Sequence, residues 1–233
     1  MVKKIGKIIG LVLISIIVIS VLSYLIFNEE LPQGVKSVQA DSLAMKMLRA
    51  INHESYQNTR YLEWTFAGHH YLWDRQQHQV VVSWKDNEVH LLTKMPDKST
   101  VEVNGEPVEG PERTALIEKA TFYFNNDSFW LVAPHKIFDP GTERRLIQME
   151  DGSEALLVTY TSGGSTPGDS YLWLLDESGL PYAWKLWVSI LPIGGLETTW
   201  EDWKTTTSGT LLPTMHKFFF IELKIGGVRG WNE

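Results

Sequence analysis

Cysteine is absent from this chain of 233 residues. Its absence excludes lipidation of a lipoprotein cysteine, structural disulfides, thiol catalysis and cysteine metal sites. Basic residues are also in the minority, with 21 Lys and Arg against 28 Asp and Glu and a net charge of −7. Nucleic acid is therefore not an expected partner, because phosphate binding needs a basic face.

The sequence also lacks the spacings of several common catalytic and metal sites. Ser162 and Ser165 lack the flanking glycines of a nucleophile elbow. The glycine-rich segment 162–168 lacks the lysine of a phosphate-binding loop and joins two predicted strands, so we interpret it as a surface hairpin or a lip beside a cavity. His69 and His70 are adjacent in a predicted strand and would point to opposite faces. We expect no metal and no cofactor.

One long apolar run is present, at the N-terminus. Residues 5–27 carry no charge after Lys7, and a helix of this length spans the roughly 30 Å hydrocarbon core of a bilayer. Lysines precede the run and Glu29 and Glu30 follow it, which places the N-terminus in the cytoplasm. The run predicts a cytoplasmic tail at 1–4, a transmembrane anchor at 5–27, a linker at 28–40 and an exported domain at 41–233.

A cleaved signal peptide is the alternative interpretation of this run. A small-residue site exists at residues 38–40, but it lies far beyond the apolar run, which is also longer than the ~7–15 residues of a signal-peptide core. Both interpretations export the domain. We expect a single-pass protein of the cytoplasmic membrane with a periplasmic domain.

Helical spacing changes to strand spacing near residue 61. Asp41 or Ser42 can cap an amphipathic helix that begins at Leu43 and ends near His53. Apolar residues then alternate with a period of two, with turn signals at 86–87 and 104–105, which predicts strands joined by hairpins.

A second helical pattern interrupts the strands in mid-chain. It begins at Pro111, and Asp127 can cap a further short helix through Leu131. Strands resume around the hairpin signal Asp151-Gly152 and continue to residue 220. We predict a mainly β (α+β) domain of about nine to eleven antiparallel strands, curled into a half-open barrel, with an N-terminal helix and a mid-chain helical lid.

Ten tryptophans is a high number for one chain. The predicted strands and the helical insertion together carry nine candidate ligand-binding aromatics: Trp64, Phe66, Trp73, Trp84, Phe122, Trp130, Trp173, Trp184 and Trp200. These residues form either a packed core or the lining of an apolar cavity that accepts acyl chains. Both interpretations depend on the same residues, so sequence alone does not separate them.

Several carboxylates lie close to tryptophans, as they do in enzymes that act on glycans. The candidates are Asp74, Asp127, Glu201 and Asp202. A glycosidase needs two carboxyl groups at a defined separation, which hairpin spacing does not reveal. Carboxylates are also common at turns and caps, and Asp127 resembles a cap.

Six short stretches carry a resemblance to a known family. They are residues 64–68, 73–74, 126–131, 138–142, 166–171 and 194–197. In these stretches, which cover most of residues 41–205, the chain resembles a family of uncharacterised bacterial membrane-anchored or exported proteins. The order of elements is also similar to that of LolA/LolB-type lipoprotein carriers, whose half-open barrel, N-terminal helix and helical lid hold acyl chains.

The carrier resemblance implies lipid binding, although a tethered chain suits acceptance or local handling of lipid better than transport. The leading hypothesis is a membrane-tethered, non-enzymatic protein of the bacterial envelope that binds acyl chains or lipoproteins. The second hypothesis is a structural or sensory module with a filled core that binds another, unidentified envelope protein. The third is a glycan-active enzyme.

Overall fold

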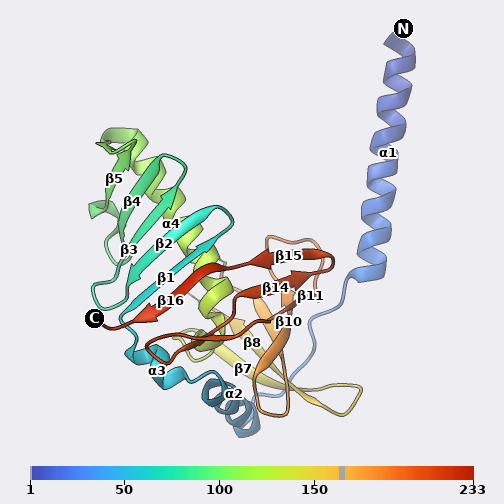
Figure 1. The fold of residues 1–233 in the computed structure, drawn as a ribbon. Coiled ribbons are helices and arrows are strands. Elements are labelled where there is room, and N and C mark those ends of the chain that lie inside the picture. Colours follow the sequence, from blue (N-terminus) through green and yellow to red (C-terminus); the bar gives the residue numbers. More distant parts are fainter. Residues whose placement is uncertain (1, 163–165) are drawn as a thin grey trace.

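A computed structural model describes residues 2–162 and 166–233, without the side chains of residues 2–9, 17, 20 and 23. The chain begins with a helix, α1 (Val2–Phe27), that stands away from a folded domain (Figure 1). Part of the predicted glycine-rich loop, Gly163 to Ser165, lies outside the described residues.

The membrane-spanning expectation receives no support from the helices themselves. With the undescribed positions of α1 set aside, no helix in the described chain is long and apolar enough to cross a membrane.

The domain contains two large antiparallel sheets. The first has seven strands in the order β16-β1-β2-β3-β4-β5-β6. Its strands are β1 (Tyr61–Phe66), β2 (His69–Asp74), β3 (Gln79–Trp84), β4 (Asn87–Leu92), β5 (Thr100–Val103), β6 (Glu106–Pro107) and β16 (Gly226–Trp231). The predicted hairpin at Asn104-Gly105 is confirmed, and both residues have the positive φ that a tight hairpin turn requires.

The second sheet has five strands in the order β11-β10-β9-β8-β7. They are β7 (Thr142–Gln148), β8 (Glu154–Tyr160), β9 (Ser170–Leu175), β10 (Pro181–Trp187) and β11 (Leu196–Thr199). Two small hairpins complete the described strands: β12 (Lys204–Thr205) with β13 (Leu211–Leu212), and β14 (Met215–Phe218) with β15 (Ile221–Lys224).

Mainly antiparallel β structure with a few helices was therefore predicted correctly, but the arrangement was not. The described strands form separate sheets and no closed barrel. They number sixteen rather than nine to eleven, because three are only two residues long and two, β15 and β16, lie beyond residue 220. The first sheet is completed by β16, which pairs with β1 across most of the chain length.

The first domain helix begins earlier than predicted. α2 (Val38–Ala50) is capped by Ser37, whose side chain accepts a hydrogen bond from the Ala40 backbone N–H at 3.2 Å. Asp41 is therefore in the first turn rather than at the cap. Buried alanines extend the apolar stripe toward the N-terminus, at Ala40 and Ala44. A short helix, α3 (His53–Asn58), leads into β1.

The mid-chain insertion is one long helix rather than two. α4 (Gly110–Val132) continues through Asp127 and is followed by the 3-10 turn η2 (Ala133–Lys136); another turn, η1 (Pro96–Lys98), precedes β5. Since Asp127 has a partner on a strand, it does not need to cap a new helix.

Two cores lie on either side of α4. The middle of the helix packs on the seven-stranded sheet through Ile117, Ala120 and Phe124. Its end, through Phe129 and Trp130, meets the five-stranded sheet, whose inner face also packs on α2. The helix crosses behind the first sheet and reaches the second (Figure 1).

Candidate functional site

Eight of the nine candidate aromatics lie in these two cores. Six are almost fully buried, with exposed fractions between 0 and 7%: Trp64, Phe66, Trp84, Trp173, Trp184 and Trp200. Trp73 and Trp130 are half-buried and pack against the cores. Phe122 points away from both and is 61% exposed, so the structure does not bring it to the other eight.

The aromatic rings contact one another directly. In the first core the ring of Trp64 stacks on that of Tyr71, with 4.6 Å between centroids. In the second, Trp184 lies 4.8 Å from Trp173 and 4.8 Å from Trp200. Contacts of this kind, centroid to centroid, leave no room for a ligand between the rings.

Four indole N–H groups in these cores have no hydrogen-bond partner among the described residues. They belong to Trp64, Trp173, Trp184 and Trp200. The planes of Trp184 and Trp200 cross at 87°, an edge-to-face geometry in which an indole edge meets the π face of its neighbour.

Two depressions lie on the surface of the domain. One, of about 350 Å³, is lined by Glu63, Trp64, Thr65, His70, Lys204, Gly227 and Arg229. The other, of about 270 Å³, is lined by Lys36, Ser37, Asp41, Thr142, Glu143 and Arg144. Trp64 has no exposed surface, so neither depression exposes a core tryptophan ring.

Asp127 joins α4 to the first sheet. Its side chain is buried, and its Oδ2 accepts hydrogen bonds from the Tyr71 hydroxyl at 2.5 Å and from His69 Nδ1 at 2.8 Å. Burial and the carboxylate together raise the pKa of Tyr71. The His69 ring also stacks on Tyr123 of α4, with centroids 3.8 Å apart. The cluster fixes the helix on the sheet and leaves the carboxylate no access to solvent.

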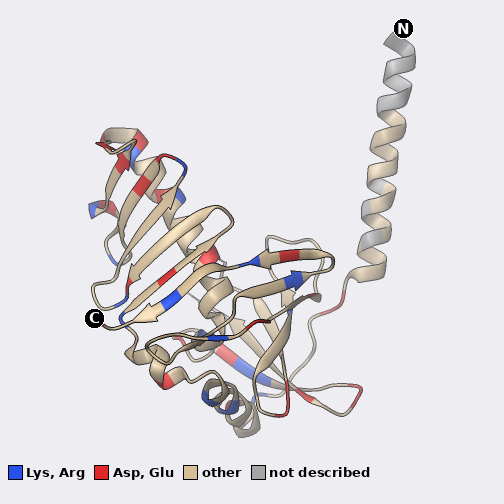
Figure 2. Cartoon of the chain, viewed as in Figure 1, with Lys and Arg blue, Asp and Glu red and all other residues tan. Residues whose placement is uncertain are grey.

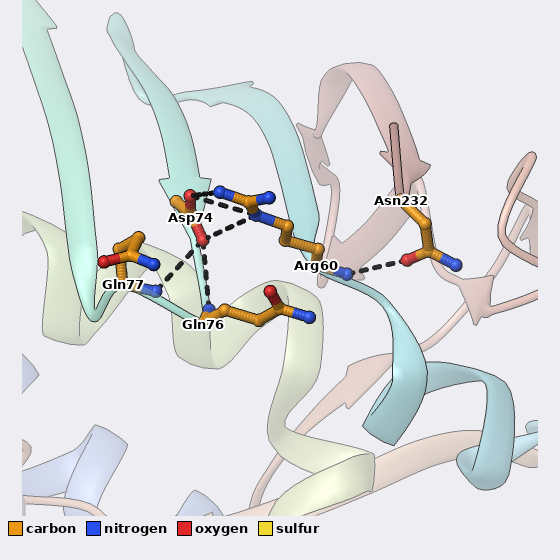
Figure 3. Close-up of polar contacts among 5 residues, drawn as sticks. All are labelled: Arg60, Asp74, Gln76, Gln77 and Asn232. Carbon is orange, nitrogen blue, oxygen red and sulfur yellow. Dashed lines mark hydrogen bonds and ion pairs between the residues drawn. The ribbon is translucent and has the colours of Figure 1, made fainter.

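Asp74 is held at the end of β2 (Figure 3). Its carboxylate accepts bonds from the Arg60 guanidinium, the shortest at 2.8 Å, and from the backbone N–H groups of Gln76 and Gln77 at 3.1 Å. The bonds from Arg60 lower the pKa of Asp74, so it stays ionised. The Arg60 backbone N–H in turn donates to Asn232 near the C-terminus.

The remaining carboxylate candidates do not complete a catalytic pair. Glu201 forms an ion pair with Lys217 at 2.7 Å, and this hydrogen bond lowers the pKa of Glu201. Neither described depression is lined by Asp74, Asp127, Glu201 or Asp202. A glycosidase needs two carboxyl groups that face one cleft, so the geometry does not favour that hypothesis.

The adjacent histidines point to opposite sides, as predicted. His69 contacts the buried Asp127, whereas His70 Nε2 bonds to Glu63 at 3.0 Å on the outer face. Within the described part of the chain, no group of three His, Asp or Glu is placed to hold a metal ion.

Sequence reasoning missed an aromatic strip on the outer face of the first sheet. Tyr61 of β1 and Trp231 of β16 stack at 5.3 Å, because the two residues are paired in register. Arg60 lies over the Tyr61 ring at 4.6 Å, and Arg229 lies 5.5 Å from the Trp231 ring. We call these four residues the outer strip.

Two buried histidine contacts were also missed. His135 lies against Tyr56, with ring centroids 4.1 Å apart, and its Nδ1 is 3.2 Å from His53 Nδ1. His216 directs both ring nitrogens at backbone carbonyls, of Thr199 and Trp130, each at 2.8 Å. Burial lowers the pKa of all three histidines, although the carbonyl contacts of His216 favour its protonated form. The partners are far apart in sequence, so no local signal marks them.

The linker is bound to the domain rather than free. The Glu29 backbone N–H donates to the Gly194 carbonyl at 3.0 Å, and the Glu29 carbonyl accepts from Trp187 Nε1 at 2.8 Å. Its carboxylate pairs with Lys185 at 2.7 Å. Any Cβ at Gly194 or Gly195 would lie within 2.6 Å of the facing Trp187 or Glu29 side chain, so the paired glycines permit this contact.

Comparison with known proteins found no protein-family model that matches the chain and no curated protein that matches its sequence. The resemblances to exported bacterial proteins and to lipoprotein carriers therefore stay predictions.

Proposed function

We propose that this chain is a membrane-anchored, non-enzymatic interaction module of the bacterial cell envelope, with a filled core and a periplasmic domain that binds another envelope protein. The observation that carries the proposal is the direct ring-to-ring packing of the buried tryptophans. It favours the filled-core hypothesis over the carriage of acyl chains.

Carriage of lipid inside the domain would require α4 to move. The helix is held by buried apolar contacts and by the hydrogen bonds that Asp127 accepts from Tyr71 and His69. An acyl chain would have to separate these groups and leave Oδ2 of a buried carboxylate without its donors, which is costly. Lipid bound at the domain interior is therefore the second candidate function.

The anchor is proposed from the sequence of residues 5–27. No charged residue occurs between Lys7 and Glu29, a length of about 30 Å in a helix. Its described apolar side chains are largely exposed, including Leu25 at 71% and Ile26 at 69%. A bilayer would remove this surface from water at about 25 cal/mol per Å².

The outer strip supports the assignment of a protein-binding face. Tyr, Trp and Arg are the residues most enriched in the energetic centres of protein interfaces. Here two aromatics and two arginines lie together on the sheet face opposite α4, beside the depression that Arg229 and His70 line. Arg229 also pairs with Glu63, which holds its side chain in place before any partner arrives.

The cysteine-free sequence allows a direct test of this face. A single cysteine replaces Arg229 in the full chain, carries a photoreactive maleimide, and is irradiated in cells; Glu112→Cys on the exposed side of α4 is the matched control. We expect one protein adduct of constant mass from position 229 only, weakened by Trp231→Ala. Equal adducts from both positions, or none from position 229, would contradict the proposal.

The anchor has its own test. Val2→Cys and Glu106→Cys chains are treated with a membrane-impermeant maleimide in cells whose outer membrane has been opened. We expect labelling at position 106 before lysis, labelling at position 2 only after it, and retention of both chains in carbonate-washed membranes. Release of the chain by carbonate would overturn the anchor.

A further inference from the structure

Two apolar loops flank the point where α1 leaves the domain. The first is the tip of the β14–β15 hairpin, where Phe219, Phe220 and Ile221 are 61, 93 and 47% exposed. The second is the loop between β10 and β11, where Ile190 and Leu191 are 71 and 40% exposed. Such large apolar side chains, grouped and exposed, mark an interaction surface.

Direct contacts place both loops at the end of α1. The Phe219 ring lies 6.0 Å from that of Phe27, the last residue of the helix. Gly194, at the end of the second loop, bonds to Asn28 and Glu29 directly after the helix. The hairpin tip and the end of α1 lie side by side at one corner of the domain, away from the far edge of the seven-stranded sheet (Figure 1).

The hairpin turn itself is unusual for a structural turn. Phe219 has a φ of 52°, in the left-handed region that bulky side chains disfavour. Tight hairpins normally place Asn, Asp or Gly at such positions. Here the turn displays Phe219 and Phe220 despite the strain at Phe219, which fits a contact of these side chains outside the domain.

Charge around the tip also fits a lipid surface. Figure 2 shows an uncharged tip, with charged residues only further along the strands. The nearest lysines are already neutralised, Lys217 by Glu201 and Lys224 by Glu222. The tip therefore offers apolar burial without a net charge. Insertion of these large apolar side chains into a bilayer would remove their surface from water.

We infer that the β14–β15 tip and the 190–191 loop insert into the outer leaflet of the same bilayer that holds α1, and so fix the orientation of the domain on the membrane. This inference rests on the proposed anchoring of α1. It assigns the surface around the helix exit to lipid and leaves the outer strip for the protein partner.

The test uses the full chain reconstituted in phosphatidylcholine vesicles. A fluorophore on Phe220→Cys reports contact with lipids that carry a nitroxide quencher in the upper acyl chain, and Glu106→Cys at the far edge of the first sheet is the control. We expect at least a twofold quench at position 220, a similar quench at Ile190→Cys and none at position 106. Equal quenching at 220 and 106 would overturn the inference.

Flotation of the same vesicles separates the two proposals. If the chain does not float with the vesicles, the anchor is wrong; if it floats but position 220 is not quenched, only the lipid contact is wrong. A second variant, Phe219→Asn with Phe220→Gly, installs a favoured turn. We expect its Tm to equal or exceed that of the parent while hydrogen exchange in residues 215–224 in vesicles increases. Unchanged protection in this variant would contradict the inference.

Discussion

Aromatic residues occupy two contrasting regions of this molecule. In the interior, tryptophans on both sheets pack against α4 and α2 and are almost completely removed from water. At the exit of α1, phenylalanines of the β14–β15 tip are exposed, and Phe220 reaches 93%. The interior aromatics are packed and buried within the fold, whereas Phe219 at the edge contacts Phe218 and Phe27 while staying 61% exposed. Aromatic content alone therefore does not identify a ligand cavity.

The largest expected effect comes from removing an interior ring. Trp184→Ala leaves a cavity between Trp173, Trp200 and Trp130, and should lower the free energy of unfolding by about 3–5 kcal/mol. Chemical denaturation of the full chain in detergent measures this loss. Phe220→Ala, the matched edge variant, should change stability by no more than about 0.5 kcal/mol. Equal losses in the two variants would remove the distinction between the regions.

The bond between α4 and β2 should give the next largest effect. Asp127→Ala leaves the buried Tyr71 hydroxyl without its acceptor, so we expect a loss of about 1–3 kcal/mol. Adding Tyr71→Phe to this variant should recover part of the loss, because the unpaired hydroxyl is then gone. Denaturation of the single and double variants measures this coupling, and strictly additive losses would show that the two groups act independently.

Stability should fall as the pH decreases from about 7 toward 5. Burial lowers the pKa values of His53, His135 and His216 in the folded chain. The unfolded chain therefore binds more protons below a pH of about 6.5, and acid favours unfolding. His53→Phe keeps the ring beside His135 but removes one titrating group, so its stability should depend less steeply on pH. Denaturation curves across this pH range measure the free energy of unfolding. If it depends on pH as steeply in His53→Phe as in the parent, His53 does not contribute to the pH dependence.

The smallest effect is expected where the linker meets the domain. In Gly194→Ala the new methyl group would lie 2.4 Å from Trp187, so residues 28–29 must move. We expect faster hydrogen exchange at Glu29 with little change in overall Tm. Gly152→Ala in the β7–β8 turn, which has open space around it but a positive φ, is the control for a strained replacement without a clash. Exchange at Glu29 that matches the parent would argue against a bound linker.

Local patterns predicted much of the fold. Alternation of apolar residues and the turn pairs identified β1 to β5, since consecutive hairpins need only neighbouring contacts. The pairing of β16 with β1 could not be predicted from the sequence, because the glycine-rich segment 226–231 carries little strand signal and its partner lies far away in the chain. The break at Asp127 was predicted wrongly because its partners, Tyr71 and His69, are also distant.

In the candidate site, too, local features were predicted and long-range contacts were not. Sequence identified the nine aromatics, and eight of them lie in the cores, but periodicity does not distinguish a packed ring from a cavity wall. The outer strip depends on the register of Tyr61 with Trp231, which no local pattern encodes. A strand was predicted to continue to residue 220, so the turn at 219–220 was missed, and the contact of Phe219 with Phe27 shows where this turn lies.

Native mass spectrometry of the full chain, released from detergent micelles, tests the filled interior most directly. We predict the mass of the chain alone, both as purified and after incubation with phospholipid vesicles, and the same result for the Trp64→Ala variant if its smaller core collapses. A phospholipid or acylated peptide that stays bound after release, and leaves only on unfolding, would contradict the account and make lipid carriage the function of this fold.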